Sequence, residues 1–172
     1  MISELPRYLF NFIFFTIIQL LVLNNIQLNG FVNPYLYVIF ILTLPFDIPG
    51  WLLLVLGFTL GMVIDVFSDT PGMHASATVL MCFLRPYVLR IIAPRDDYQL
   101  GTLPTMNYYG ASWFLRYAII LVFAHHLFLF FVEVFSVTHF FSTFLRVITS
   151  TFFTIILILI AQLFSKGKKQ GR

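Results

Sequence analysis

The sequence predicts an all-α integral membrane protein, built as a single bundle of about six transmembrane helices. Of its 172 residues, 60% are hydrophobic and only 10% are charged, whereas a soluble domain carries about 25% charged residues. The 22 Phe residues add more apolar surface than a protein can expose to water. Six spans of about 20 residues would occupy most of the chain, so we expect one membrane domain over residues 1–172.

The first predicted span covers residues 8–28 and is long enough to cross about 30 Å of hydrocarbon at 1.5 Å per residue. Residues 2–7 carry one acid and one base, and residues 24–27 lack the small side chains of a signal-peptide cleavage site. We therefore expect a retained helix and not a signal peptide. Amide side chains interrupt this span, among them Asn11, Gln19, Asn24 and Asn25.

The second predicted span, residues 31–45, is shorter than the others. Its apolar run, Tyr35–Leu44, lies between Pro34 and Pro45 and is short for a membrane crossing. We expect this segment to be tilted, extended backwards into the preceding linker, or only half inserted. The remaining predicted spans are longer and cover residues 50–67, 73–93, 112–135 and 139–164.

Charges between the spans predict the orientation. The loops around Gly30, Asp69 and Thr138 contain no Lys or Arg. Alternating six spans places the basic residues on the other side, together with both termini, and the positive-inside rule makes that side cytoplasmic. We assign the net charge of +3 to topology and lipid headgroups, and expect no nucleic-acid binding. The basic residues are Arg7, Arg90, Arg95, Arg116, Lys166, Lys168, Lys169 and Arg172.

Polar residues inside the third and fourth segments form the first candidate site. Gly57, Gly61 and Asp65 recur every four residues and therefore share one helical face. Small residues at this spacing let another helix approach closely, so the face either packs within the chain or binds a partner or ligand. A tight turn at Pro71-Gly72 would make the two helices antiparallel and bring His74 within hydrogen-bonding reach of Asp65.

Further polar residues lie in the fourth, fifth and sixth segments. Glu133 and Arg146 are each within about two turns of the same membrane face, so we predict an intramembrane ion pair. Arg85 is expected to extend its guanidinium toward the cytoplasmic headgroups. His125 and His126 lack the spacing of metal ligands, and we interpret them as packing residues. No metal site is predicted.

Catalytic motifs are missing from the sequence. It contains no Gly-x-Ser-x-Gly, no Walker phosphate loop, no His-Glu-x-x-His and no pair of carboxylates within one apolar segment. Each of those chemistries needs its residues, so we expect neither an enzyme nor a cofactor. A transporter stays open, because six helices with polar outer halves can enclose a small ligand.

The stretch from residue 45 to 95 carries a family pattern. A Pro precedes the third segment, a Gly-x-x-x-Asp runs from Gly61 to Asp65, and Gly72 is followed by His74-Ala75. This pattern resembles the rod shape-determining protein MreD family. The HH pair and the LFLFFVEVFSV that follows it, through Thr154, are similar to the form of that family found in one bacterial branch.

The resemblance implies a non-catalytic scaffold of the cell-elongation machinery in the bacterial cytoplasmic (inner) membrane. Its implied partners are the single-span MreC, the actin-like MreB and the elongation-complex peptidoglycan synthases. The MreD family is also similar in architecture to the six-helix substrate-binding subunits of energy-coupling-factor vitamin transporters, which supply the alternative function. The sequence leaves open which face binds MreC, which lipids are held, and whether the protein forms a homodimer.

Overall fold

The computed structural model describes residues 5–26, 32–95, 97–99, 102–135 and 139–164, and its regular elements are helices. The helices, in chain order, are α1 (Leu5–Leu21), the 3₁₀ turns η2 (Leu23–Asn25) and η3 (Leu36–Val38), α2 (Ile39–Leu42), α3 (Gly50–Ser68), α4 (Met73–Ile91), α5 (Met106–Tyr109), α6 (Ala111–Val134) and α7 (Phe140–Phe164).

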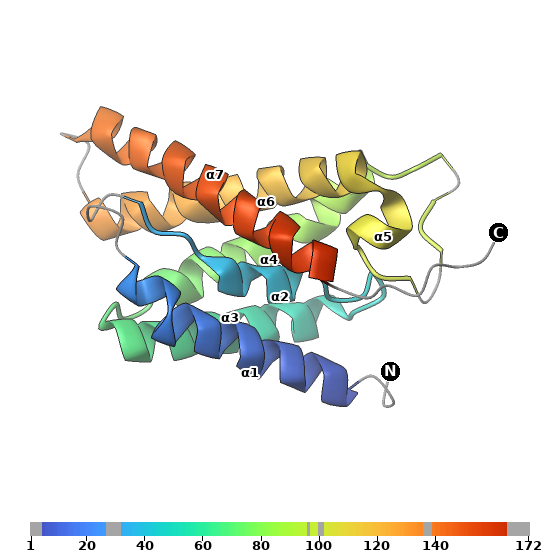
Figure 1. Ribbon diagram of the computed structural model, residues 1–172, viewed down its shortest axis with the longest axis horizontal. Coiled ribbons are helices and arrows are strands. Elements are labelled where there is room, and N and C mark those ends of the chain that lie inside the picture. The colour runs from blue at the N-terminus through green and yellow to red at the C-terminus, as the bar shows by residue number, and fades with distance from the viewer. Residues whose placement is uncertain (1–4, 27–31, 96, 100–101, 136–138, 165–172) are drawn as a thin grey trace.

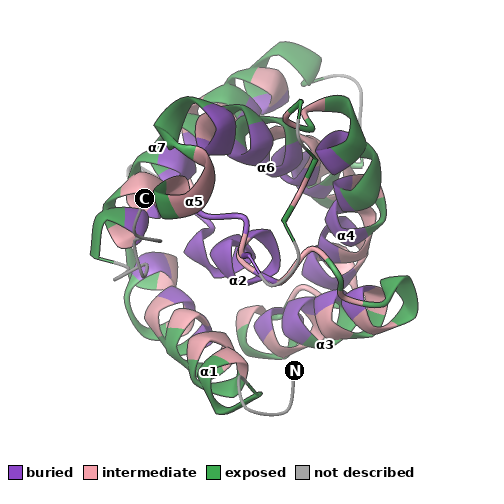
Figure 2. Cartoon of the chain, turned by 90° about the vertical axis from the view of Figure 1, so that its right-hand side faces the viewer, coloured by how far each residue is buried: buried purple, intermediate pink, exposed green. Residues whose placement is uncertain are grey.

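The long helices form a ring around a short central segment. In Figure 1, α1, α3, α4, α6 and α7 run along the long axis of the molecule, and the view along that axis in Figure 2 shows them arranged around the buried α2. Large apolar side chains such as Phe10, Val66 and Phe141 are exposed on the outside of the ring. Such a surface suits a lipid solvent and not water.

Among the described residues, four helices are long and apolar enough to cross a membrane: α1 continued by η2, α3, α6 and α7. The chain is therefore a multi-pass α-helical membrane protein, as predicted. The predicted count of six spanning helices is not confirmed among the described residues. The helix α4 has the same length as α3 and packs beside it, but it carries His74, Arg85 and Arg90 and is less apolar.

The second predicted span, residues 31–45, is expected from the sequence to be tilted, extended backwards or only half inserted. In the described part of it, residues 32–45, the helical portion consists only of η3 and α2, over residues 36–42. Pro34 precedes the segment and Pro45 follows it, and proline removes a backbone donor at each place. The segment is too short to cross the bilayer and lies inside the ring.

The turn between α3 and α4 has a local cause. Asp69 ends α3 in the left-handed conformation with φ of 53°, and Gly72 precedes α4 with φ of 82°. Glycine adopts this conformation without steric cost. Four residues, 69–72, therefore reverse the chain and place α3 and α4 antiparallel, as predicted.

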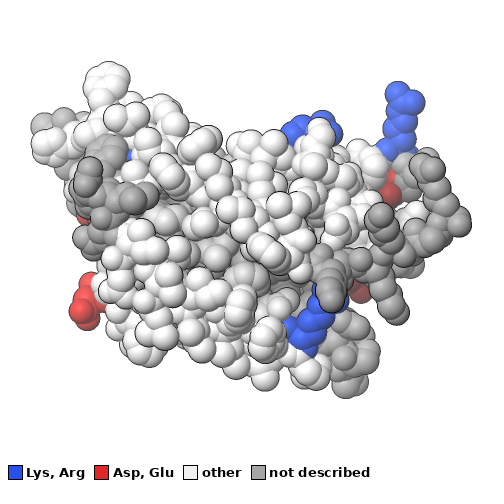
Figure 3. Space-filling view, viewed as in Figure 1, with Lys and Arg blue, Asp and Glu red and all other residues white. Residues whose placement is uncertain are grey.

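Basic side chains collect at one end of the bundle. Arg7 lies at the start of α1, Arg90 in the last turn of α4 and Arg116 near the start of α6. Because of the directions in which these helices run, the three side chains lie at the same end of the bundle. Figure 3 shows most of the blue Arg side chains visible on its face toward this end. We call it the basic end, and the end with the α3–α4 turn the far end. The tail bases Lys166, Lys168, Lys169 and Arg172, and the predicted loop positions Gly30 and Thr138, lie outside the described residues.

Candidate functional site

The central segment, residues 32–45, donates hydrogen bonds from its backbone N–H groups to side chains of the ring. Gln19 of α1 accepts at Oε1 from the N–H of Leu36, at 2.7 Å, and Thr154 of α7 accepts at Oγ1 from the N–H of Tyr35, at 3.0 Å. Tyr37 is completely buried. Irregular backbone is tolerated at membrane depth only where protein satisfies it, and these two side chains supply the partners where the segment enters the bundle.

Arg85 of α4 donates hydrogen bonds to backbone carbonyls at the other end of the central segment. Its Nη2 donates to the carbonyls of Leu44 and Pro45, and its Nε donates to the Tyr117 hydroxyl at 2.8 Å. That hydroxyl donates in turn to the carbonyl of Leu42, at 3.2 Å. Arg85 is only 1% exposed, so the prediction that it reaches toward the headgroups is wrong. The carbonyls at the end of so short a helix as α2 have no partner within the helix. The guanidinium supplies donors for the carbonyls that follow it.

The predicted face of Gly57, Gly61 and Asp65 lies against α4. A Cβ on Gly61 would stand 2.6 Å from the carbonyl oxygen of His74 and 2.6 Å from the N–H nitrogen of Ala75. A Cβ on Gly57 would meet the side chain of Cys82. Because backbone atoms fill the space beside Gly61, the face packs within the chain, and the interpretation as a surface open to a partner does not describe this structure.

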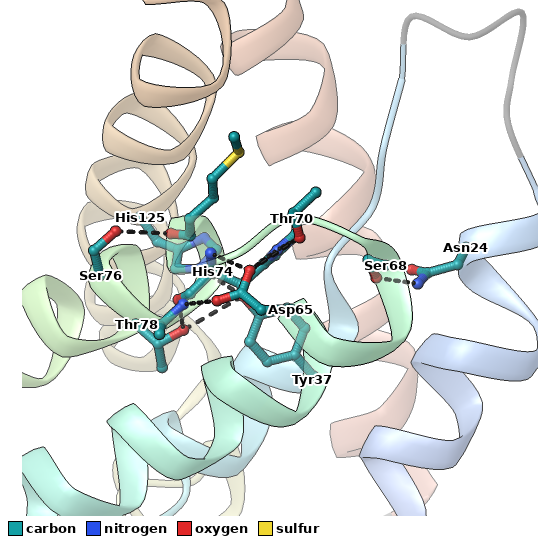
Figure 4. A network of polar contacts seen from close by, with 11 residues as sticks. Asn24, Tyr37, Asp65, Ser68, Thr70, His74, Ser76, Thr78 and His125 are labelled. Carbon is teal, nitrogen blue, oxygen red and sulfur yellow. Dashed lines mark hydrogen bonds and ion pairs between the residues drawn. The ribbon is translucent and has the colours of Figure 1, made fainter.

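Asp65 completes this contact with hydrogen bonds to the start of α4. Its Oδ1 accepts from the His74 N–H and the Thr70 hydroxyl, both at 2.9 Å, and its Oδ2 accepts from the Ala75 N–H at 2.9 Å. The imidazole Nδ1 of His74 lies 3.0 Å from Oδ1. Figure 4 shows Asp65, Thr70 and His74 converging at the turn. The carboxylate caps the positive end of α4. We name Asp65, Thr70 and His74, together with Gly57 and Gly61, the α3–α4 lock.

Aromatic and imidazole rings pack beside the lock. The Tyr37 hydroxyl lies 2.8 Å from Nε2 of His125, and the Tyr35 ring packs edge-on against the ring of His74, with centroids 5.1 Å apart. His126 donates from Nδ1 to a carbonyl of its own helix, at 2.8 Å. His125 and His126 are fully buried. The described residues contain no group of three or more His, Cys, Asp or Glu side chains that could hold a metal ion.

A polar cavity of about 310 Å³ opens at the far end of the ring. At its edge, Arg146 Nη1 of α7 donates to Glu133 Oε1 of α6 at 3.0 Å, and the guanidinium carbon lies 4.2 Å from the centre of the Phe130 ring. The side chain of Glu133 is 36% exposed and that of Arg146 is 17% exposed. We call this cavity the far-end pocket. Other polar residues that line it are Gln19, Asn24, Asn33, Tyr35, Ser68, Thr70 and His74.

Several residues of these networks were not predicted from the sequence to belong to a site. Gln19 and Tyr37 each make a bond that joins distant parts of the chain, whereas Thr70 bonds Asp65, five positions away in the same turn. For Gln19 a signal existed, because an amide within an apolar span must meet protein or water. For Tyr37 and Thr70 the sequence offers no comparable signal, since both residue types are frequent at membrane interfaces and turns.

Fold and site together define the class: a multi-pass α-helical membrane protein whose long helices enclose a short central segment, hydrogen-bonded to the ring at both ends. Compared with family models, curated protein sequences and solved structures, the chain matches none.

Proposed function

We propose that this chain is a non-catalytic membrane scaffold of the rod shape-determining MreD family, acting in bacterial cell elongation. In this proposal it lies in the cytoplasmic membrane with both termini in the cytoplasm. It binds MreC and links actin-like MreB to peptidoglycan synthases. The central segment would complete a six-element architecture similar to that of the substrate-binding subunits of energy-coupling-factor transporters.

The observation that carries the proposal is the α3–α4 lock. Gly61, Asp65 and His74 of the family-like pattern all take part in it, so the spacing of that pattern has a structural reason. Both carboxylate oxygens of Asp65 accept hydrogen bonds from the chain itself. Such a site holds two helices rigidly together, which suits a protein that positions others. The outward apolar faces of the ring are available to the helices of membrane partners.

Depletion of this protein in the bacterium that encodes it tests the proposal. We expect rod-shaped cells to become round, and the tagged protein to copurify with the single-span coiled-coil partner MreC. As a matched pair, Asp65→Ala should fail to restore rods while Asp69→Asn, which changes an exposed residue of the same turn, should restore them. Normal rods after depletion, or the absence of MreC from the purified complex, would contradict the proposal.

The far-end pocket favours a second candidate, the substrate-binding subunit of a vitamin transporter. Its volume of about 310 Å³ lies at the small end of the range for ligand sites, and the pair of Glu133 and Arg146 offers both charges to a polar ligand. This candidate requires tight binding of a small molecule and an energising ATPase module. A purified, ligand-free protein should then show a raised melting temperature with one member of a vitamin panel, and Arg146→Gln should abolish that shift. No shift with any vitamin would eliminate this candidate.

A further inference from the structure

A second and larger cavity, of about 670 Å³, lies between α1 and α7 at the basic end. Its walls are mainly apolar. Phe14 and Ile18 of α1 face Leu157 and Ile160 of α7 across it, and Ile39 of the central segment also lines it. We call this cavity the α1–α7 groove. It shares no lining residue with the α3–α4 lock.

The length of the groove matches the depth of one membrane leaflet. Its lining runs along α1 from Arg7 to Ile18, which are eleven positions apart and thus separated by about 16 Å of helix. One leaflet of a bilayer contributes about 15 Å of hydrocarbon. The groove therefore begins at the level where lipid headgroups lie and ends near the middle of the membrane.

Polar groups are concentrated at the headgroup end of the groove. The cation Arg7 lines it there, together with Thr105 and Gln162. Gln162 is only 2% exposed, and the buried hydroxyl of Thr105 has no hydrogen-bond partner among the described residues. A cation beside a hydroxyl and an amide suits phosphate and ester oxygens. The apolar walls deeper in the groove suit a hydrocarbon chain.

We infer that the α1–α7 groove is a binding site for one anionic phospholipid from the leaflet at the basic end. One acyl chain lies along Ile18, Leu157 and Ile160, and the phosphate lies near Arg7. A transmembrane helix fits less well, because it is a rigid cylinder at least about 10 Å wide. A flexible chain adapts to an irregular groove that a rigid cylinder cannot fill.

Native mass spectrometry of the protein, released from micelles containing phosphatidylglycerol, tests the site. The natural protein should retain one phosphatidylglycerol. Ala161→Trp, which fills the groove, should lower the retained fraction about tenfold. Leu163→Trp adds the same bulk two residues along α7, at an exposed position outside the lining, and should retain the lipid. Equal retention by the two variants, or none by the natural protein, would overturn the inference.

A photo-reactive residue at Ile160 identifies the occupant in the intact membrane and does not depend on how well a Trp variant folds. Irradiation should give an adduct with the mass of a phospholipid. A protein adduct, whether with another chain or a second copy of this one, would overturn the inference. Arg7→Gln supplies the test of charge. It should lower the preference for phosphatidylglycerol over phosphatidylethanolamine, and an unchanged preference would remove the anionic specificity.

Discussion

Asp65 and His74 are joined twice, because one carboxylate oxygen accepts from the backbone N–H of His74 and also lies 3.0 Å from its imidazole Nδ1. Both residues are almost completely buried. Water cannot replace the bonds when one partner is removed, and unpaired buried groups are costly. The turn between α3 and α4 is therefore fixed by a side chain and not by the loop alone.

Asp65→Asn is expected to destabilise the protein by about 2 kcal/mol, because the amide nitrogen cannot accept from the N–H of Ala75 or His74. Asp69→Asn is the control, since Asp69 is exposed and asparagine tolerates its left-handed backbone. Unfolding by denaturant in detergent micelles measures the free energy of unfolding of both variants. Equal stability of the two variants would show that the lock contributes nothing to the fold.

Gly61→Ala should cost about 1–3 kcal/mol, the usual effect of forcing extra volume into a packed site. The added Cβ would meet backbone atoms of His74 and Ala75, which cannot rotate away. Gly50→Ala is the matched control, because a Cβ there has nothing within 4 Å. Thermal unfolding of the two variants side by side checks the difference. A stable Gly61→Ala protein would mean that α3 and α4 are further apart.

Arg85→Lys is expected to destabilise the protein by about 1–3 kcal/mol even though it keeps the charge. A lysine ammonium cannot reach Tyr117 and the carbonyls beside Leu44 in the same fork, so buried acceptors lose their donor. Arg90→Lys, at an exposed position of the same helix, should leave stability unchanged. Unfolding curves distinguish them, and tolerance of lysine at position 85 would contradict the bonds assigned to the guanidinium.

Tyr98 lies in the connection between α4 and α6, outside the spanning helices, where its ring stacks on Phe46 with centroids 4.3 Å apart. Burial raises the pKa of its hydroxyl from 10.0 to about 12. The folded state thus holds this proton more firmly, so the stability linked to Tyr98 is complete below pH 10 and declines between pH 10 and 12.

The difference in phenolate absorbance between the natural protein and Tyr98→Phe isolates this titration. A midpoint near pH 12 is expected for the folded protein, and one near pH 10 after denaturation. A midpoint near pH 10 in the folded protein would show that the ring is solvated.

Much of the helical framework could be predicted from the sequence. The bounds of α3, α4, α6 and α7 agree with the predicted segments to within two residues, because long apolar runs end at prolines, glycines or charges that the sequence displays. The apolar run of residues 35–44 has the same composition as a span. Only its tertiary partners decide that it turns inward, and periodicity cannot reveal these.

The candidate sites show the same division. The turn at Pro71-Gly72 was enough to predict that Asp65 and His74 lie at one level, since the two residues are close in sequence. Arg85 binds a carbonyl 41 residues away. A local rule about long cationic side chains therefore gave the wrong direction for Arg85, because it took no account of the unpaired carbonyls at the end of α2.

The bond from Tyr35 to Thr154 spans 119 positions of the chain and sets an order for biogenesis. At 5–20 residues per second, synthesis of the intervening chain takes on the order of ten seconds. During that time the N–H of Tyr35 cannot have its final partner, since Thr154 does not yet exist. The central segment therefore reaches its native state after the last helix has entered the membrane, and a ribosome that stalls before α7 leaves the newborn protein open at its centre.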